Sequence, residues 1–130
     1  YFEVWCDAVT SKVPFTVMSH PDLVKKFNRL PSFDPKPLYK QAAEAARAAG
    51  RMVEVNTSGL TYACKEMFPC QDLLREFCHA GVLCTIGSDA HQPSKVNQFI
   101  EEGYRWMYEA GYREVSVVRP DGDIRTISIV

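Results

Sequence analysis

The sequence predicts an α/β protein in which parallel strands are joined by crossover helices. Short apolar runs with the composition of strands alternate at least three times with segments of helical periodicity. Parallel strands need long connections of this kind, and the connecting helices cover the sheet. Polar side chains follow the ends of three of these strands, where α/β proteins hold their active sites. We therefore expect a parallel sheet with one functional edge.

Length and composition indicate one globular domain. The chain has 130 residues, of which 46% are hydrophobic and 24% charged. Fifteen basic and sixteen acidic residues leave a net charge of −1, which does not favour nucleic acid or an anionic membrane as a partner. The sequence has no apolar run long enough to cross a bilayer and no signal-peptide pattern at its start. We therefore expect a cytoplasmic protein without nucleic-acid or membrane partners.

A helix end and a strand are predicted first. Residues 1–10 have the amphipathic pattern of the tail of a helix. The apolar run 13–18 is rich in strand-forming residues and stops at Ser19, so His20 follows the carboxyl end of a strand. A short helix opened by Pro21 is predicted next. Within it the apolar side chains should face the core and the lysines should face solvent, with Leu23, Val24 and Phe27 inward and Lys25 and Lys26 outward.

Loops, helices and strands alternate through the rest of the chain. Three prolines make 30–37 a loop, which ends with Asp34 as N-cap and Pro35 as the first helical residue. The remaining elements follow from periodicity and from glycine stops. We expect helices at 38–49, 69–80 and 94–110, and strands at 52–56 and 82–87. The helix at 94–110 should pack through Val96. Strands at 114–118 and 124–130 should form a terminal hairpin or a strand with an edge strand.

The cysteines predict reduced thiols rather than a framework of disulfides. Their number is odd and none has the spacing of a zinc ribbon. We expect them to be mostly buried in a cytosolic protein. They are Cys6, Cys64, Cys70, Cys78 and Cys84.

Asp89 and His91 form a candidate pair of metal ligands. They follow the strand 82–87 at positions i and i+2, so both side chains can reach one ion. Imidazole and carboxylate without thiolate favour Zn, Mn or Fe(II), and the lack of a carboxylate cage disfavours Ca. The alternative is that Asp89 caps the next helix and His91 lies in a surface loop.

Two further strand ends carry polar residues. His20 follows the first predicted strand, and Asn56 with Ser58 follows the second. In a parallel sheet these ends share one face with Asp89 and His91, which favours a metal site that activates water for hydrolysis. These residues are few for a multinuclear site, so a catalytic site needs further ligands from outside this chain.

Three ordered motifs resemble the C-terminal half of the PHP (polymerase and histidinol phosphatase) domain family. The motifs are Ser-His-Pro-Asp-Leu at 19–23, Glu-Val-Asn-Thr-Ser-Gly-Leu at 54–60 and Gly-Ser-Asp-Ala-His at 87–91. The resemblance covers about residues 1–111 and is closest to the histidinol-phosphatases of this family. Residues 112–130, the terminal strands or hairpin, resemble the variable tail of the family only loosely.

The resemblance implies the C-terminal part of a distorted (β/α)7 TIM-like barrel that hydrolyses a phosphomonoester at a trinuclear centre of Zn, Mn or Fe. By motif, His20, Asp89 and His91 would be metal ligands, and the last two would belong to the catalytic centre. Glu54, Asn56 and Ser58 would lie close to the substrate or support the ligands. Glu54 could equally be a charge inside the barrel that is paired with a basic residue.

The family's N-terminal His-x-His motif, its bridging Glu and its other histidines have no counterpart in the sequence. We therefore expect residues 1–130 to be one incomplete domain that lacks an N-terminal half, and that is inactive alone or completed by another chain. An exposed apolar flank where strands are missing would favour self-association.

The expected reaction is hydrolysis of L-histidinol phosphate to L-histidinol and phosphate, in histidine biosynthesis. One alternative is a PHP phosphoesterase with a nucleotide or sugar-phosphate substrate, and another is a PHP-like binding or regulatory module without catalysis. A thiol-based enzyme is the weakest alternative, because Cys78 and His79 are neighbours on a helix and point in different directions.

Overall fold

The computed structural model describes residues 1–129 and has a three-stranded parallel sheet at its centre. The strands are β1 (Val17–Met18), β2 (Met52–Asn56) and β3 (Cys84–Gly87), in the order β1-β2-β3. Val17 pairs with Met52, and Val53 pairs with Cys84. The predicted α/β class and parallel sheet are therefore confirmed, and Val130 of the last predicted strand lies outside the described residues.

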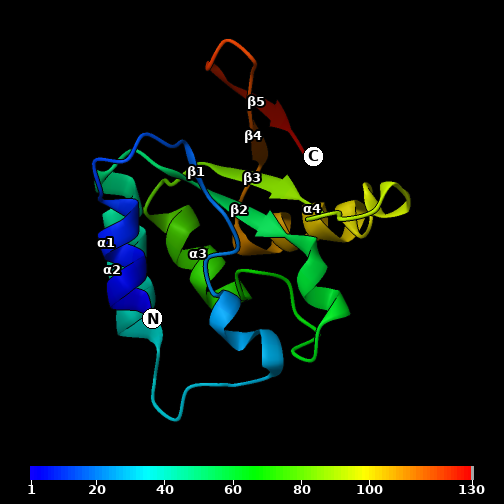
Figure 1. Ribbon diagram of the computed structural model, residues 1–130. Helices are drawn as coiled ribbons and strands as arrows, with labels where there is room; N and C mark the ends of the chain where they lie inside the picture. Colours follow the sequence, from blue (N-terminus) through cyan, green and yellow to red (C-terminus); the bar gives the residue numbers. More distant parts are fainter. Residues whose placement is uncertain (130) are drawn as a thin grey trace.

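Four α-helices connect and flank these strands. They are α1 (Phe2–Val9), α2 (Lys36–Ala48), α3 (Gln71–His79) and α4 (Ile100–Ala110), and each packs against the next in this order (Figure 1). Three short 3₁₀ helices follow the strand ends or lie in the connections: η1 (Leu23–Phe27), η2 (Thr57–Thr61) and η3 (Pro93–Lys95).

Successive side chains of β2 point alternately to the apolar core and to the other face of the sheet, where polar residues lie. Val53 and Val55 are fully buried and belong to the apolar core shared with the helices. Burial of each such valine contributes about 1.5–3 kcal/mol to the stability of the fold. Successive side chains of a strand point to opposite faces, so Glu54 and Asn56 lie on the other side of the sheet. The two faces of one short strand thus serve the core and the site.

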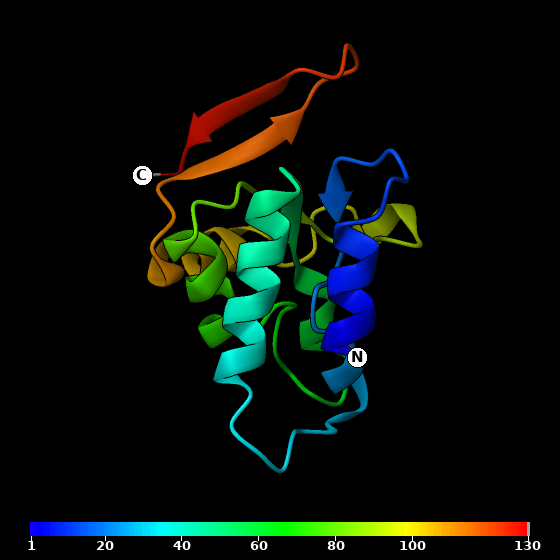
Figure 2. The ribbon, with the colours of Figure 1, turned by 90° about the vertical axis from the view of Figure 1, so that its left-hand side faces the viewer.

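The chain ends in an antiparallel hairpin of β4 (Glu114–Val118) and β5 (Ile124–Ser128). This hairpin forms its own two-stranded sheet. Figure 2 shows it extending beyond one end of the helical layer. Val115 is 4% exposed and anchors β4 in the core, whereas β5 is exposed along its length. Of the two predicted arrangements for these strands, the hairpin is correct.

Several element boundaries differ from the prediction. The strand predicted at 13–18 has ladder pairing only at Val17 and Met18. Pro35 is the N-cap of α2 rather than its first helical residue, although Asp34 Oδ1 accepts the N–H of Lys36 (3.1 Å), which is the kind of hydrogen bond that a capping side chain makes. The helix predicted at 69–80 begins at Gln71, after a cis Phe68–Pro69 peptide bond.

The predicted helix 94–110 is wrong over its first six residues, since α4 begins at Ile100. Two hydroxyl side chains donate hydrogen bonds to backbone carbonyl oxygens of this segment. Ser88 Oγ donates to Val96 O (2.6 Å), and Thr57 Oγ1 donates to Gln98 O (2.6 Å). These bonds give the carbonyls partners that a helix would otherwise supply. Val96, predicted to pack, is 59% exposed.

The prediction of which η1 side chains point to the core is also wrong. Lys25 is 5% exposed, whereas Val24 and Phe27 are 48% and 72% exposed. A 3₁₀ helix has three residues per turn instead of 3.6, so side chains fall on different faces from those of an α-helix. Lys25 is also drawn inward by Asp22 and Glu66, to which its ammonium binds.

All five cysteines are free, as predicted, but only Cys84 is buried. The other four are half-buried, so the prediction of mostly buried thiols is wrong in degree. Among residues 1–129, no helix is both long and apolar enough to cross a membrane.

Candidate functional site at the strand ends

The carboxyl ends of β1, β2 and β3 lie at one edge of the sheet, because the strands are parallel (Figure 1). His20 follows β1, Asn56 ends β2, and Asp89 follows β3. This arrangement matches the expectation that the predicted site residues share one edge. Two hydrogen-bonded groups of side chains form there.

Glu54 joins the ends of all three strands. Its Oε2 accepts the backbone N–H of His20 (3.2 Å) and the side-chain Nδ2–H of Asn56 (3.2 Å). Its Oε1 lies where a side chain at Gly87 would be, so β3 needs a glycine at this position. No ion pair to Glu54 is present between described residues, and the alternative of a barrel charge paired with a basic residue stays a prediction.

Asn56 carries the hydrogen-bonded chain from Glu54 to Ser58. Asn56 is 1% exposed, and its Oδ1 accepts both the N–H (3.1 Å) and the Oγ–H (2.6 Å) of Ser58. Both ends of the amide are therefore bonded, which fixes its orientation. Ser58 lines the cavity that holds Asp89 and His91. The three residues of the Glu-x-Asn-x-Ser motif thus act as one connected support.

Asp89 and His91 come together at the end of β3. His91 Nδ1 lies 2.8 Å from the carbonyl oxygen of Asp89 and 4.0 Å from its Oδ1. A carbonyl can only accept, so Nδ1 carries the proton and Nε2 of the neutral ring is left with its lone pair. Asp89 has a φ of +52°, a left-handed conformation that is uncommon outside glycine.

This pair lines an open cavity of about 300 Å³, and the His91 side chain is 82% exposed, as the surface-loop alternative predicts. Five of its lining residues were not predicted from the sequence, and Lys95 among them brings a cation. No local motif marked them, since they come from the end of η2 and from the segment between β3 and α4. They are Thr61, Tyr62, Gln92, Lys95 and Gln98.

His20 stands apart from this cavity. It is half-buried, has a φ of +33°, and is held through its backbone N–H by Glu54. It does not line the cavity around Asp89 and His91. In the part of the chain that the structure describes, no three His, Cys, Asp or Glu side chains are close enough together to hold one ion. The predicted metal set of His20, Asp89 and His91 stays a prediction.

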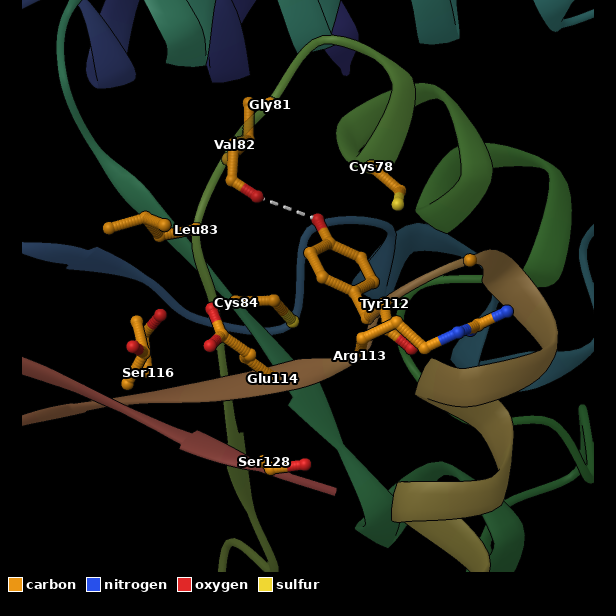
Figure 3. Close-up of a pocket in the computed structure, with 12 residues that line it drawn as sticks. Cys78, Gly81, Val82, Leu83, Cys84, Tyr112, Arg113, Glu114, Ser116 and Ser128 are labelled. Carbon is orange, nitrogen blue, oxygen red and sulfur yellow. Dashed lines mark hydrogen bonds between the residues drawn. The ribbon is translucent and has the colours of Figure 1, made fainter. Parts of the chain in front are cut away.

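A second cavity, of about 450 Å³, lies at the opposite end of β3 and contains two thiols (Figure 3). The Tyr112 hydroxyl donates to Val82 O (2.8 Å) beside Cys78 and Cys84. Burial raises the pKa of both thiols, which keeps them protonated and unreactive. Cys78 faces this cavity while His79 is exposed, so their adjacency does not build a nucleophile.

The chain is similar in sequence to a protein of Deinococcus radiodurans described as a probable histidinol-phosphatase. The two are 33% identical over 103 residues, which are 78% of this chain and 38% of the relative. The chain thus spans less than half the length of the curated relative that it matches. No protein-family profile matches the chain. The similarity relates this chain to one segment of that longer protein.

Proposed function

We propose that this chain is the C-terminal portion of a metal-dependent phosphomonoester hydrolase of the PHP family, with L-histidinol phosphate as substrate. The observation that carries the proposal is the Asp89–His91 pair at the end of β3, where the imidazole Nε2 is left with its lone pair. The similarity to a probable histidinol-phosphatase supports the same reaction. The products would be L-histidinol and phosphate.

The donor set at the strand ends fits Zn, Mn or Fe(II). His91 offers the lone pair of Nε2 and Asp89 its carboxylate after β3, and His20 offers a second imidazole after β1, on the other side of β2. Such ions, when bound, supply a nucleophilic hydroxide at neutral pH and stabilise charge on phosphoryl oxygens. A multinuclear centre would need further ligands from an N-terminal half of the same protein.

The residues of this chain would orient the ligands and the substrate. Glu54 and Asn56 hold the His20 backbone and Ser58 in place through hydrogen bonds. Lys95 lines the cavity beside Asp89 and His91 and would attract the phosphate as a point charge. The hydrogen bond from the His91 ring Nδ1 to the carbonyl oxygen of Asp89 fixes the tautomer whose Nε2 can bind a metal.

The same proposal covers the whole chain. Residues 1–111 would be the C-terminal part of a (β/α)7 barrel and 112–130 its terminal extension, in a cytoplasmic protein. We propose that residues 1–130 are inactive alone, and that their free sheet edges lead to self-association. β1 and β3 are the outer strands of the described sheet, and their outer sides have no ladder partner among the described strands, although β4 packs against β3.

Phosphate release from L-histidinol phosphate tests this proposal. The assay uses the longer parent protein with added Mn or Zn, and compares the unchanged protein with Asp89→Asn and with Asp7→Asn. Asp7 is an exposed carboxylate on α1 and serves as the matched control. We expect metal-dependent turnover that Asp89→Asn lowers at least about a hundredfold, since removal of a transition-state contact costs this much, and that Asp7→Asn leaves unchanged.

Two other results would replace the proposal. Turnover of a nucleotide or sugar phosphate, without turnover of L-histidinol phosphate, would indicate a PHP phosphoesterase with another substrate. A folded, metal-loaded parent that hydrolyses no phosphomonoester in such a panel would indicate a non-catalytic module.

A further inference from the structure

We propose that a third cavity, enclosed by α1, the loop after η1 and the start of α2, binds a small amine with an apolar body. The cavity measures about 410 Å³, within the range of ligand pockets. Figure 2 shows the loop between η1 and α2 passing beneath the amino-terminal ends of α1 and α2. The cavity shares no lining residue with the cavity around Asp89 and His91, so the inference goes beyond the proposed hydrolase.

The walls of this cavity are apolar and come from separate segments. Phe33 and Leu30 are 60% and 69% exposed on the loop, which indicates that they are not held in a core of their own. Side chains of this kind bury the carbon skeleton of a ligand. The apolar lining includes Phe2, Val24, Leu30, Phe33, Leu38 and Tyr39.

The charged residues of the cavity centre on Lys25, whose donors are all used. Its Nζ donates to Glu66 Oε2 (2.8 Å), to Met67 O (2.7 Å) and to Asp22 Oδ2 (3.1 Å). An ammonium has three N–H groups, so Lys25 has none left for a ligand. The other cation of the lining, Arg29, lies at an exposed position where water and salt screen its charge. An anionic ligand would therefore meet two carboxylates with only this screened cation to balance them.

The carboxylates, in contrast, have acceptors to spare. Asp22 is 3% exposed, and its Oδ2 also accepts the N–H of Cys70 (2.9 Å), while its Oδ1 is closed to solvent without a hydrogen-bond partner among the described residues. The Glu66 side chain is 35% exposed, so its second oxygen is within reach of a ligand. Excess acceptors beside apolar walls are complementary to a group that only donates, which is an ammonium on an apolar skeleton.

A titration with 2-phenylethylamine tests this inference, with 2-phenylethanol and 3-phenylpropionate as neutral and anionic probes of similar shape. Binding is followed by amide chemical shifts of the full chain. We expect the amine to bind roughly tenfold more tightly than the alcohol, as one charge-assisted hydrogen bond allows, and more tightly still than the carboxylate. The shifts should centre on η1 and on the loop before α2.

Three variants locate the site. Phe33→Ala removes an exposed part of the wall without touching the core, and should weaken amine binding at least about tenfold. Asp22→Asn keeps the shape but removes the charge, and should abolish the preference for the amine over the alcohol. Arg29→Gln changes the cation that lines the cavity without using a proposed contact, and should not weaken amine binding.

The inference is overturned by equal affinity for amine and alcohol, by an absence of binding at millimolar amine, or by unchanged binding in Phe33→Ala. The last comparison remains decisive if Asp22→Asn does not fold. None of these results depends on metal or on phosphatase turnover, so the failure of this inference is distinguishable from that of the proposed hydrolase.

Discussion

Two carboxylates of this chain have different roles because their surroundings differ. Glu54 is half-buried and accepts two N–H groups, whereas Asp22 is buried and binds an ammonium. Burial raises the pKa of Asp22, and the charge of Lys25 acts in the opposite direction. Both residues belong to motifs of the sequence, but only the folded chain shows which partner each one has.

Replacing Glu54 by glutamine should weaken metal binding without unfolding the chain. The amide keeps one acceptor oxygen but loses the charge that holds the His20 N–H and Asn56. Loss of such support lowers metal affinity by about 10–100-fold. The measurement is a calorimetric titration of the parent protein with Zn, together with amide exchange at His20. Glu44→Gln, at an exposed position of α2, is the control, and equal affinities of the two variants would contradict the role assigned to Glu54.

Replacing Lys25 by methionine should strongly destabilise the chain. The change leaves the buried Asp22 carboxylate without its cation, and breaking a buried pair in this way costs about 3–5 kcal/mol. Urea unfolding of the chain measures the loss. Lys40→Met removes an exposed lysine from α2 and should change the free energy of unfolding by less than about 0.5 kcal/mol. Similar losses in both variants would show that the Lys25 ion pair does not stabilise the fold.

At the scale of elements, the position of α4 depends on one close contact. A Cβ at Gly103 would collide with Ile86 of β3 and approach Thr57 Cγ2 to 3.0 Å. The helix therefore lies so close to β3 and η2 that a larger residue at Gly103 would require the Ile86 side chain to move. Because Thr57 and Ile86 adjoin the strand ends, the seating of α4 also affects the site.

Gly103→Ala should lower the free energy of unfolding by about 1–3 kcal/mol, as overpacking of a core does. It should also shift the amide resonances of 88–99, the segment held by Ser88 and Thr57. Glu101→Ala, at an exposed position of the same helix, is the control. If Gly103→Ala is as stable as Glu101→Ala, α4 has room to move and the close contact has no energetic role.

Elements were predictable from the sequence where one local signal decided them. The run 52–56 reads as a strand and is one, and the turn around Gly122 forms the predicted hairpin. The failures at α4 and η1 came from tertiary contacts: Ser88 bonds the carbonyl of Val96, and Lys25 turns inward to distant acceptors. Neither contact leaves a periodic pattern in the sequence.

For the site, the positions of residues at the strand ends were predictable, whereas their side-chain contacts were not. Parallel strands alone place His20, Asn56 and Asp89 at one edge, and the structure agrees. The bonds from Glu54 to His20 and to Asn56, and the place of Lys95 in the cavity, depend on side-chain positions across strands and loops. The amine cavity depends on segments that come together only in the folded chain.

At the scale of the whole molecule, partly buried acids should make the fold sensitive to alkaline pH. Burial, with a smaller effect of the Asp22 charge, raises the pKa of Cys70 from 9.0 to about 11. Burial likewise raises the pKa of Tyr1 from 10.0 to about 12. The unfolded chain therefore loses these protons at lower pH than the folded chain does.

The free energy of unfolding should consequently fall as pH rises from about 9 to about 11. Urea unfolding at several pH values across this window measures the fall. Cys70→Ala removes one of the contributing acids and should give a shallower fall. A free energy of unfolding that stays constant over the window would contradict the raised pKa values.

The two outer strands of the central sheet have a geometric consequence for assembly. The free edge of β1 and that of β3 are different surfaces, because the strands run parallel in the order β1-β2-β3. If one copy adds to another by continuing the sheet in the same direction, the β3 edge of the first meets the β1 edge of the second, and each addition leaves the same two edges free. Such head-to-tail growth has no natural stop at two copies, and it ends only where the twist of the strands brings the first copy round to meet the last.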